Sequence, residues 1–239
     1  MAFRWDFSKR EQLGSWIDLH DHVGLIDDEM IDFIRADSAR IVAAAEGAGL
    51  AFVGRTPENY FDYLSGAFLH VNEAPFLQLV QYSMRSIPEG GIKQIPKERF
   101  RALDDYFRRA KVHPENIAKS ATAFAFVDFV STGGTFKTFC QSLRRMASDA
   151  GVDWNAVQRN LMLIGLVSRG ENSPTTWRWQ QNQDWLDLIN KVKIRNVSAD
   201  KYFLHYIVNN QYKSTPAFRQ NRWDFDSSRD FEVNNKYAK

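Results

Sequence analysis

A short segment in the middle of the chain combines an acidic side chain with a loop of glycine and hydroxyl residues. It reads AFVDFVSTGGTF and covers residues 125–136. The backbone amides of such a loop can converge on one point, glycine lets a ligand approach the main chain, and a following helix adds the positive end of its dipole. The segment therefore predicts a site for an anion such as a phosphate monoester, formed by Ser131, Thr132, Gly133, Gly134 and Thr135.

Asp128 comes near the end of the apolar stretch that precedes this loop. Open α/β folds bind ligands at the carboxyl edge of the sheet, and a carboxylate there can accept hydrogen bonds from sugar hydroxyl groups. Because the carboxylate repels the phosphate itself, the pair suits a ribose 5-phosphate better than free phosphate. Two plainer interpretations stay open: Asp128 caps the following turn, and the loop is an ordinary connection between a strand and a helix.

The elements that must position these residues alternate between strands and helices. Residues 121–130 are nearly continuous in apolar side chains, as in a central parallel strand covered on both faces. The patterns predict further strands at 50–53, 76–82, 160–167 and 192–197, an edge strand at 175–180, and helices at 28–45, 57–64, 97–111, 114–119, 136–148 and 184–190. This alternation predicts an α/β fold with a parallel-sheet core, flanking helices and right-handed crossovers.

Length and composition favour a single core with an extension at each end. With 239 residues, 44% of them hydrophobic, the chain can bury a substantial core. We expect an N-terminal arm at 1–27, the α/β domain at 28–208 and a C-terminal extension at 209–239.

Charge and cysteine content narrow the classes of partner and compartment. The net charge of +2 comes from 31 basic and 29 acidic residues spread along the chain, whereas nucleic-acid-binding proteins usually gather their cations on one face. The single cysteine, Cys140, allows no intrachain disulfide. The chain also lacks an apolar run of roughly eighteen residues. The sequence therefore predicts a cytoplasmic protein with no membrane span and no strong nucleic-acid signal.

Residues 124–135 resemble the ribose-phosphate signature of the type I phosphoribosyltransferases. In that family an apolar strand leads into two adjacent acids, two apolar residues and a Thr-Gly-x-Thr loop. Asp128 matches the second acid, Phe129 and Val130 match the apolar pair, and 131–135 matches the loop, whereas Val127 stands where the first acid is usual. The resemblance implies a phosphoribosyltransferase-like fold.

The resemblance also implies a donor substrate and a metal ion. Members of the family transfer ribose 5-phosphate from phosphoribosyl pyrophosphate to a nucleophilic nitrogen, usually of a base, with Mg²⁺ present. The ion would be held by oxygens of the substrate and by water, so no protein ligand is required.

Further site residues follow from the same resemblance. The family holds pyrophosphate in an upstream turn, to which Gly54, Arg55 and Thr56 correspond, although Arg55 and Thr56 also suit an ordinary helix start. A mobile loop at 85–99 contributes two candidate cations, Lys93 and Lys97. Arg55 and Lys93 then join Asp128 as candidate catalytic residues, and Gly54 and Thr56 join the loop 131–135 as candidate substrate-binding residues.

Three functions stay open on the sequence. The first is a phosphoribosyltransferase-like enzyme, and the second is a non-catalytic sensor of phosphoribosyl pyrophosphate or a nucleotide, which Val127 favours. The third is an interaction module whose aromatic-rich extensions dock onto a partner or onto a second copy of the chain as a homo-oligomer. His20 and His22 could suggest a metal site, but without a third spaced ligand they fit a solvated turn better.

Overall fold

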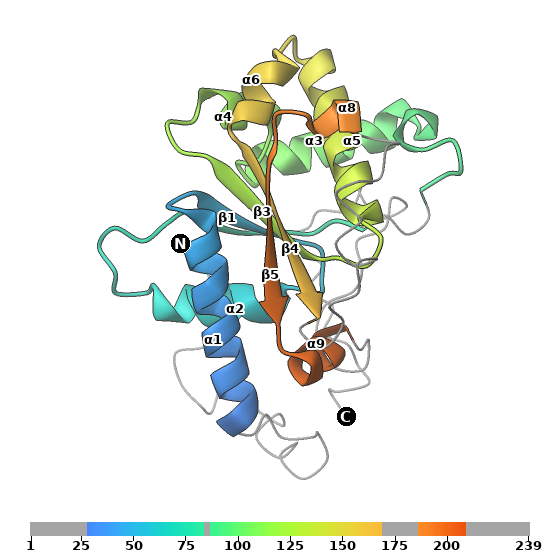
Figure 1. The fold of residues 1–239 in the computed structure, drawn as a ribbon. Helices are drawn as coiled ribbons and strands as arrows, with labels where there is room; N and C mark the ends of the chain where they lie inside the picture. Colours follow the sequence, from blue (N-terminus) through green and yellow to red (C-terminus); the bar gives the residue numbers. More distant parts are fainter. Residues whose placement is uncertain (1–27, 84–86, 169–185, 209–239) are drawn as a thin grey trace, which may run out of the picture.

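The computed structural model describes residues 28–83, 87–168 and 186–208. These residues form one five-stranded sheet in the order β2-β1-β3-β4-β5, and every neighbouring pair of strands is parallel (Figure 1). The strands are β1 (Gly49–Val53), β2 (Leu77–Val80), β3 (Phe124–Phe129), β4 (Leu161–Ser168) and β5 (Lys193–Ala199). The predicted α/β fold with a parallel sheet is confirmed.

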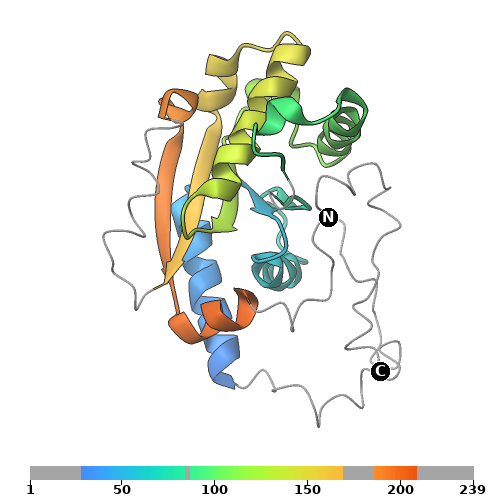
Figure 2. The same ribbon diagram turned by 90° about the vertical axis from the view of Figure 1, so that its right-hand side faces the viewer.

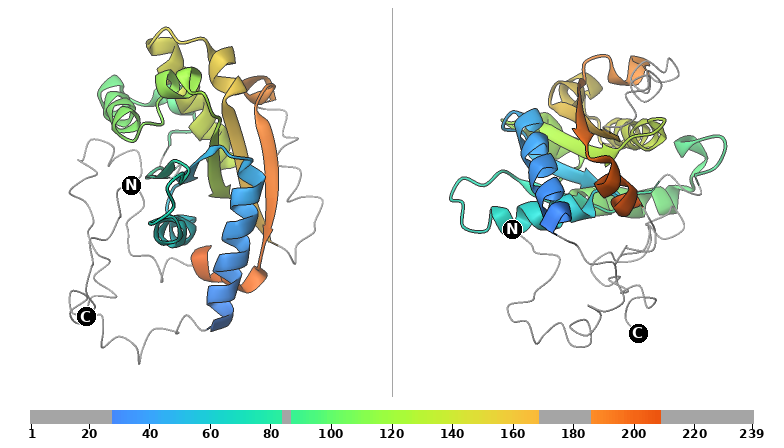
Figure 3. Two further views of the ribbon diagram at one scale, coloured as in Figure 1. Left: turned by 90° about the vertical axis from the view of Figure 1, so that its left-hand side faces the viewer. Right: turned by 60° about the horizontal axis from the view of Figure 1, so that its bottom comes forward.

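Helices cover both faces of the sheet. One face carries α1 (Asp28–Ala45), α2 (Glu58–Ala67) and α9 (Lys201–Val208). The other face carries α3 (Lys97–Arg109), α4 (Pro114–Lys119), α5 (Gly134–Asp149), α6 (Trp154–Arg159) and α8 (Leu186–Ile189), and the short 3₁₀ helix η2 (Ile92–Gln94) packs beside α5. Figure 2 shows α5 and α1 on opposite sides of the sheet, and Figure 3 shows α1 running alongside β5.

Successive side chains of β3 enter the two cores in turn. Phe124 and Phe126 face α5, where the ring of Phe126 lies 4.8 Å from that of Phe139, measured between centroids. Ala125 and Val127 face the layer formed by α1, α2 and α9. Burial on both faces explains why this strand has an unbroken apolar sequence.

Two short helices of the structure are not predicted by the sequence. α6 spans six residues, and the carboxylate of Asp153 caps it by accepting a hydrogen bond from the amide of Asn155. Fewer than two helical turns give too few apolar positions to reveal a period. α9 buries Phe203, Leu204 and Ile207 within a stretch whose aromatic content masks its helical spacing.

Several sequence predictions concern other parts of the chain. The edge strand at 175–180, the arm at 1–27 and the extension at 209–239 lie outside the described residues. Within the described ranges, no helix combines the length and the apolar character needed to cross a membrane.

Gly54 closes β1 in a conformation that other residues rarely adopt. Its φ is +76°, its amide donates to the carbonyl of Val80 at 2.8 Å, and an added Cβ would lie 2.9 Å from the carbonyl oxygen of Tyr82. Both the backbone conformation and the close contact therefore require glycine.

Replacing Gly54 tests this constraint on the end of β1. We expect Gly54→Ala to lower the free energy of unfolding by roughly 1–3 kcal/mol, because the variant combines a strained φ with a backbone clash. Urea denaturation measures the change.

Gly66→Ala is the matched control. Gly66 lies in α2, and an added Cβ there meets no atom within 4 Å. Its stability should stay the same or rise by up to about 1 kcal/mol. Equal losses in both variants would contradict the account.

Candidate functional site

The strand order places two loops side by side at the carboxyl edge of the sheet. β1 pairs with β2 on one side and with β3 on the other. The chain leaves β1 for α2 on one face of the sheet and leaves β3 for α5 on the opposite face. Such a switch point opens a crevice between the two loops, and doubly wound folds bind ligands there.

A pocket of about 250 Å³ occupies this edge. The turn after β1 contributes Thr56, and the other lining residues belong to the end of β3, the following loop and the first turn of α5: Asp128, Phe129, Val130, Ser131, Thr132, Gly133, Gly134, Thr135 and Phe136. The acid and the loop selected from the sequence thus share one pocket with a residue far upstream in the chain.

The loop directs the N-terminus of α5 at this pocket. Gly133 has a φ of +80° and precedes the helix without any side-chain cap, and the amide of Lys137 makes the first helical hydrogen bond to its carbonyl at 2.9 Å. Amides of a first helical turn have no partner within the helix. The amides of Gly134 and Thr135 are therefore suited to bind an anion, and the dipole of the 16-residue helix favours negative charge at that end.

Buried contacts hold the loop at both ends. The amide of Val130 donates to the carbonyl of Leu166 in β4 at 3.0 Å, and the side chain of Phe136 is fully buried. The hydroxyl of Thr138 donates to the carbonyl oxygens of Gly134 and Thr135 at 3.1 and 3.0 Å. The shape of the loop is therefore set by the protein before any ligand binds.

Asp128 is a buried carboxyl group at the wall of this pocket, and its side chain is only 6% exposed. Burial raises its pKa to about 8, although hydrogen bonds from the amide of Phe129 at 2.8 Å and from the side chain of Thr135 act in the opposite direction. The carboxyl group therefore ties the end of β3 to the first turn of α5, as the capping interpretation predicts, and it also borders the pocket.

Val127 belongs to the opposite face of β3. Its side chain is fully buried in the core beneath α1, α2 and α9, and it lies in register with Phe52 of β1 and Ile164 of β4. An acid at this position would sit in an apolar core rather than beside Asp128. The resemblance treats Val127 as a lost ribose partner, whereas the backbone of this protein turns that position away from the pocket.

The remaining candidate residues lie at different distances from the pocket. Thr56 lines it, Gly54 shapes the turn that carries Thr56, and Arg55 is half-buried in the same turn without contributing to the lining. Lys93 lies in η2, whose neighbour Ile92 accepts a hydrogen bond from Arg145. Arg145 is about 15 Å along α5 from Thr135, so the structure does not bring Lys93 to the loop.

The sequence does not assign a binding role to the apolar wall of the pocket. Phe129, Val130 and Phe136 line it. The resemblance includes Phe129 and Val130 only as the apolar pair of the signature, and Phe136 matches any helix start, so no sequence signal marks these side chains as part of a pocket wall. No group of three or more His, Cys, Asp or Glu residues that could hold a metal ion occurs among the described residues. His20 and His22 lie outside those residues.

Comparisons with protein-family models, with curated proteins and with solved structures gave no match. The geometry of the pocket therefore carries the functional argument.

The pKa of Asp128 predicts how stability depends on pH. The folded state holds this proton up to about pH 8, whereas an unfolded chain releases it near the usual value of 3.8. Stability from this group is therefore complete below pH 4 and is lost as the pH rises to 8, by on the order of 5 kcal/mol in total.

Asp128→Asn removes this titration while keeping the shape of the side chain. We expect the variant to gain stability relative to the wild type as the pH rises from 4 to 8, as measured by urea denaturation at each pH. Asp105→Asn, at an exposed position of α3, should leave the wild-type profile unchanged. A constant difference between wild type and Asp128→Asn at every pH would contradict the account.

Proposed function

We propose that this protein is a phosphoribosyltransferase-like enzyme that transfers or exchanges ribose 5-phosphate, from phosphoribosyl pyrophosphate to a nitrogenous acceptor. One observation carries the proposal: the loop 131–135 and the buried carboxyl group of Asp128 border one pocket at the switch point of a parallel sheet. The resemblance of residues 124–135 to the family signature names the ligand that such a pocket suits.

The 5-phosphate would bind at the start of α5. The amides of Gly134 and Thr135 would donate to its oxygens, and the left-handed conformation of Gly133 leaves the main chain open to the ligand. Neutral amides and a helix dipole can hold a phosphate without a cation beside it. This fits a lining that contains no Lys or Arg among the described residues.

Asp128 would bind the ribose hydroxyl groups. Its side chain borders the pocket near the end of β3, the strand that leads into the phosphate loop. Hydroxyl donors stabilise the ionised form of a carboxyl group, so a bound sugar would lower the pKa of Asp128 from its value of about 8. The sugar would thereby gain charge-assisted hydrogen bonds.

The turn after β1 would face the leaving group. In the proposed reaction the bond between C1 of ribose and the pyrophosphate oxygen breaks, a bond from C1 to the acceptor nitrogen forms, and that nitrogen releases its proton. Thr56 borders the pocket and Arg55 lies beside it in sequence. They would stabilise charge on the departing pyrophosphate, which is where such stabilisation lowers the barrier.

A magnesium ion fits this site through its substrate. Among the described residues that line the pocket, only Asp128 has a carboxyl group, and Mg²⁺ commonly keeps water and substrate phosphate oxygens as ligands. When bound, the ion would neutralise charge on the pyrophosphate.

A sensor that binds the same ligand without turnover is the second candidate. Two observations favour it: the described lining has no cation to meet pyrophosphate, and Lys93 lies toward the other end of α5. Measurements of binding and of turnover separate the two candidates.

Binding can be tested by thermal stability with phosphoribosyl pyrophosphate and Mg²⁺. At about a hundred times its dissociation constant the ligand should add about 2.7 kcal/mol. Thr132→Glu places a negative charge in the exposed phosphate loop, so it should weaken binding at least tenfold. Thr122→Glu adds the same charge at an exposed position before β3 and should keep the stabilisation. Absence of stabilisation in the wild type would refute both candidates.

Turnover can be tested by pyrophosphate release in the presence of a panel of nucleobases. If the protein is a transferase, Asp128→Asn should reduce release roughly 10- to 100-fold, because the sugar loses a charged hydrogen-bond acceptor. Asp105→Asn again serves as the control. Stabilisation by the ligand without release for any base would instead establish the sensor.

A further inference from the structure

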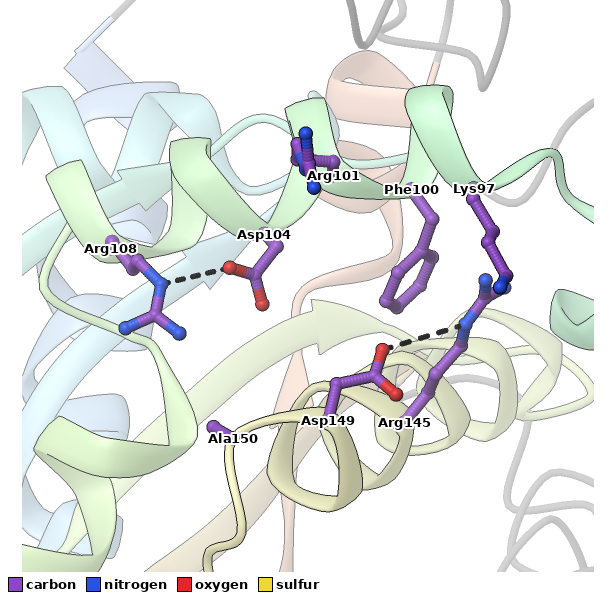
Figure 4. A pocket seen from close by; sticks show the side chains of 8 residues that line it. All are labelled: Lys97, Phe100, Arg101, Asp104, Arg108, Arg145, Asp149 and Ala150. Atoms are coloured by element: carbon purple, nitrogen blue, oxygen red, sulfur yellow. Dashed lines mark hydrogen bonds and ion pairs between the residues drawn. The ribbon is translucent and has the colours of Figure 1, made fainter.

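A second cavity lies between α3 and the C-terminal end of α5, away from the proposed phosphoribosyl site. Its volume is about 390 Å³. Figure 4 shows its lining, which contains four cationic and two acidic side chains: Lys97, Phe100, Arg101, Asp104, Arg108, Arg145, Asp149 and Ala150. We call this cavity the α3–α5 cleft.

Arg145 is held in place on the floor of the cleft. Its guanidinium carbon lies 3.9 Å from the ring centroid of Phe100, and its Nη1 donates to the carbonyl oxygens of Ile92 and Ile95 at 2.8 and 3.4 Å. Its Nη2 has no hydrogen-bond partner among the described residues. A guanidinium fixed in this way can bind an anion without losing further side-chain freedom.

Two other cations of the cleft have no partner among the described residues. Lys97 and Arg101 are exposed and make no hydrogen bond or ion pair with any described residue. They are four residues apart on α3, which places their Cβ atoms about 6 Å apart on one side of the helix. Figure 4 shows Lys97 and Arg101 on α3 and Arg145 on α5, so cationic side chains from two helices border the cleft.

The acidic side chains of the cleft leave this charge largely uncompensated. Asp104 accepts a hydrogen bond from Arg108 at 2.8 Å and also contacts the buried ring of His113 at 3.0 Å. Asp149 is 66% exposed and lies 4.0 Å from Nε of Arg145, at the limit of an ion pair. Because the charged atoms are this far apart and Asp149 is largely in solvent, the pair contributes little. Cations on two sides of a cleft with so weak a counter-charge favour a bound anion.

We propose that the α3–α5 cleft is a second anion site, which binds a multiply charged phosphate ligand through Lys97, Arg101 and Arg145. Cations from two helices surround such a ligand, and the planar guanidinium groups match the spacing of phosphate oxygens. The site is separate from the pocket at Thr135, because Arg145 lies about 15 Å along α5 from that residue. It does not depend on the function proposed for that pocket.

Titration of the ¹⁵N-labelled full-length protein with inorganic pyrophosphate, without Mg²⁺, tests this site by amide chemical shifts. We expect saturable shifts at 97–101 and 145–150, which are distinct from any shifts at 131–135. Lys97→Gln combined with Arg101→Gln should raise the dissociation constant read at 97–101 at least tenfold. All substituted side chains are exposed, so the spectra of the variants should otherwise match that of the wild type.

Arg144→Gln combined with Lys201→Gln removes the same charge at exposed positions outside the cleft. This control pair should change the dissociation constant less than twofold. The proposal is overturned if 97–101 and 145–150 do not shift, or if both variant pairs weaken binding equally, because the interaction would then reflect net charge alone.

Discussion

The buried carboxyl group of Asp128 is the contact on which the rest of the site depends. It accepts hydrogen bonds from the amide of Phe129 and from the side chain of Thr135, and so joins the end of β3 to the start of α5. Burial makes this group costly to ionise, with a pKa near 8. A carboxyl group that is costly to ionise suits a site whose ligand donates further hydrogen bonds to it. The contact between Asp128 and Thr135 also orients the first amides of α5 toward the pocket.

The sheet explains why a pocket forms beside this contact. β1 and β3 are neighbours, and the helices that follow them, α2 and α5, cover opposite faces of the sheet. The loops after the two strands therefore diverge and leave a crevice between them. α5 runs from this pocket to the α3–α5 cleft. Its uncapped N-terminus faces the pocket, and its other end carries Arg145, which is fixed by Phe100 and by the carbonyl oxygens beside η2. One rigid helix thus supports both proposed anion sites.

The sequence predicts the parallel α/β fold, and the residues that it selects for an anion site, Asp128 and the loop 131–135, line one pocket in the structure. The apolar run at 121–130 and the glycine-containing loop that follows it are local signals, and the structure forms β3 and the start of α5 there. The orientation of Val127 follows from strand alternation, but motif matching alone does not reveal it. The position of Lys93 depends on how η2 packs against α5, and the α3–α5 cleft depends on residues some fifty positions apart, as in the bond from Arg145 to Ile92. Contacts between residues so far apart in the chain produce no periodic pattern that a single sequence could reveal.

The most direct measurement is a crystal structure of the protein in complex with phosphoribosyl pyrophosphate and Mg²⁺. The account predicts that the 5-phosphate accepts hydrogen bonds from the amides of Gly134 and Thr135, and that the ribose hydroxyl groups face Asp128. A ligand bound elsewhere, with only water in this pocket, would contradict the account. Unfolding of the loop after Val130 when the ligand binds would contradict it as well.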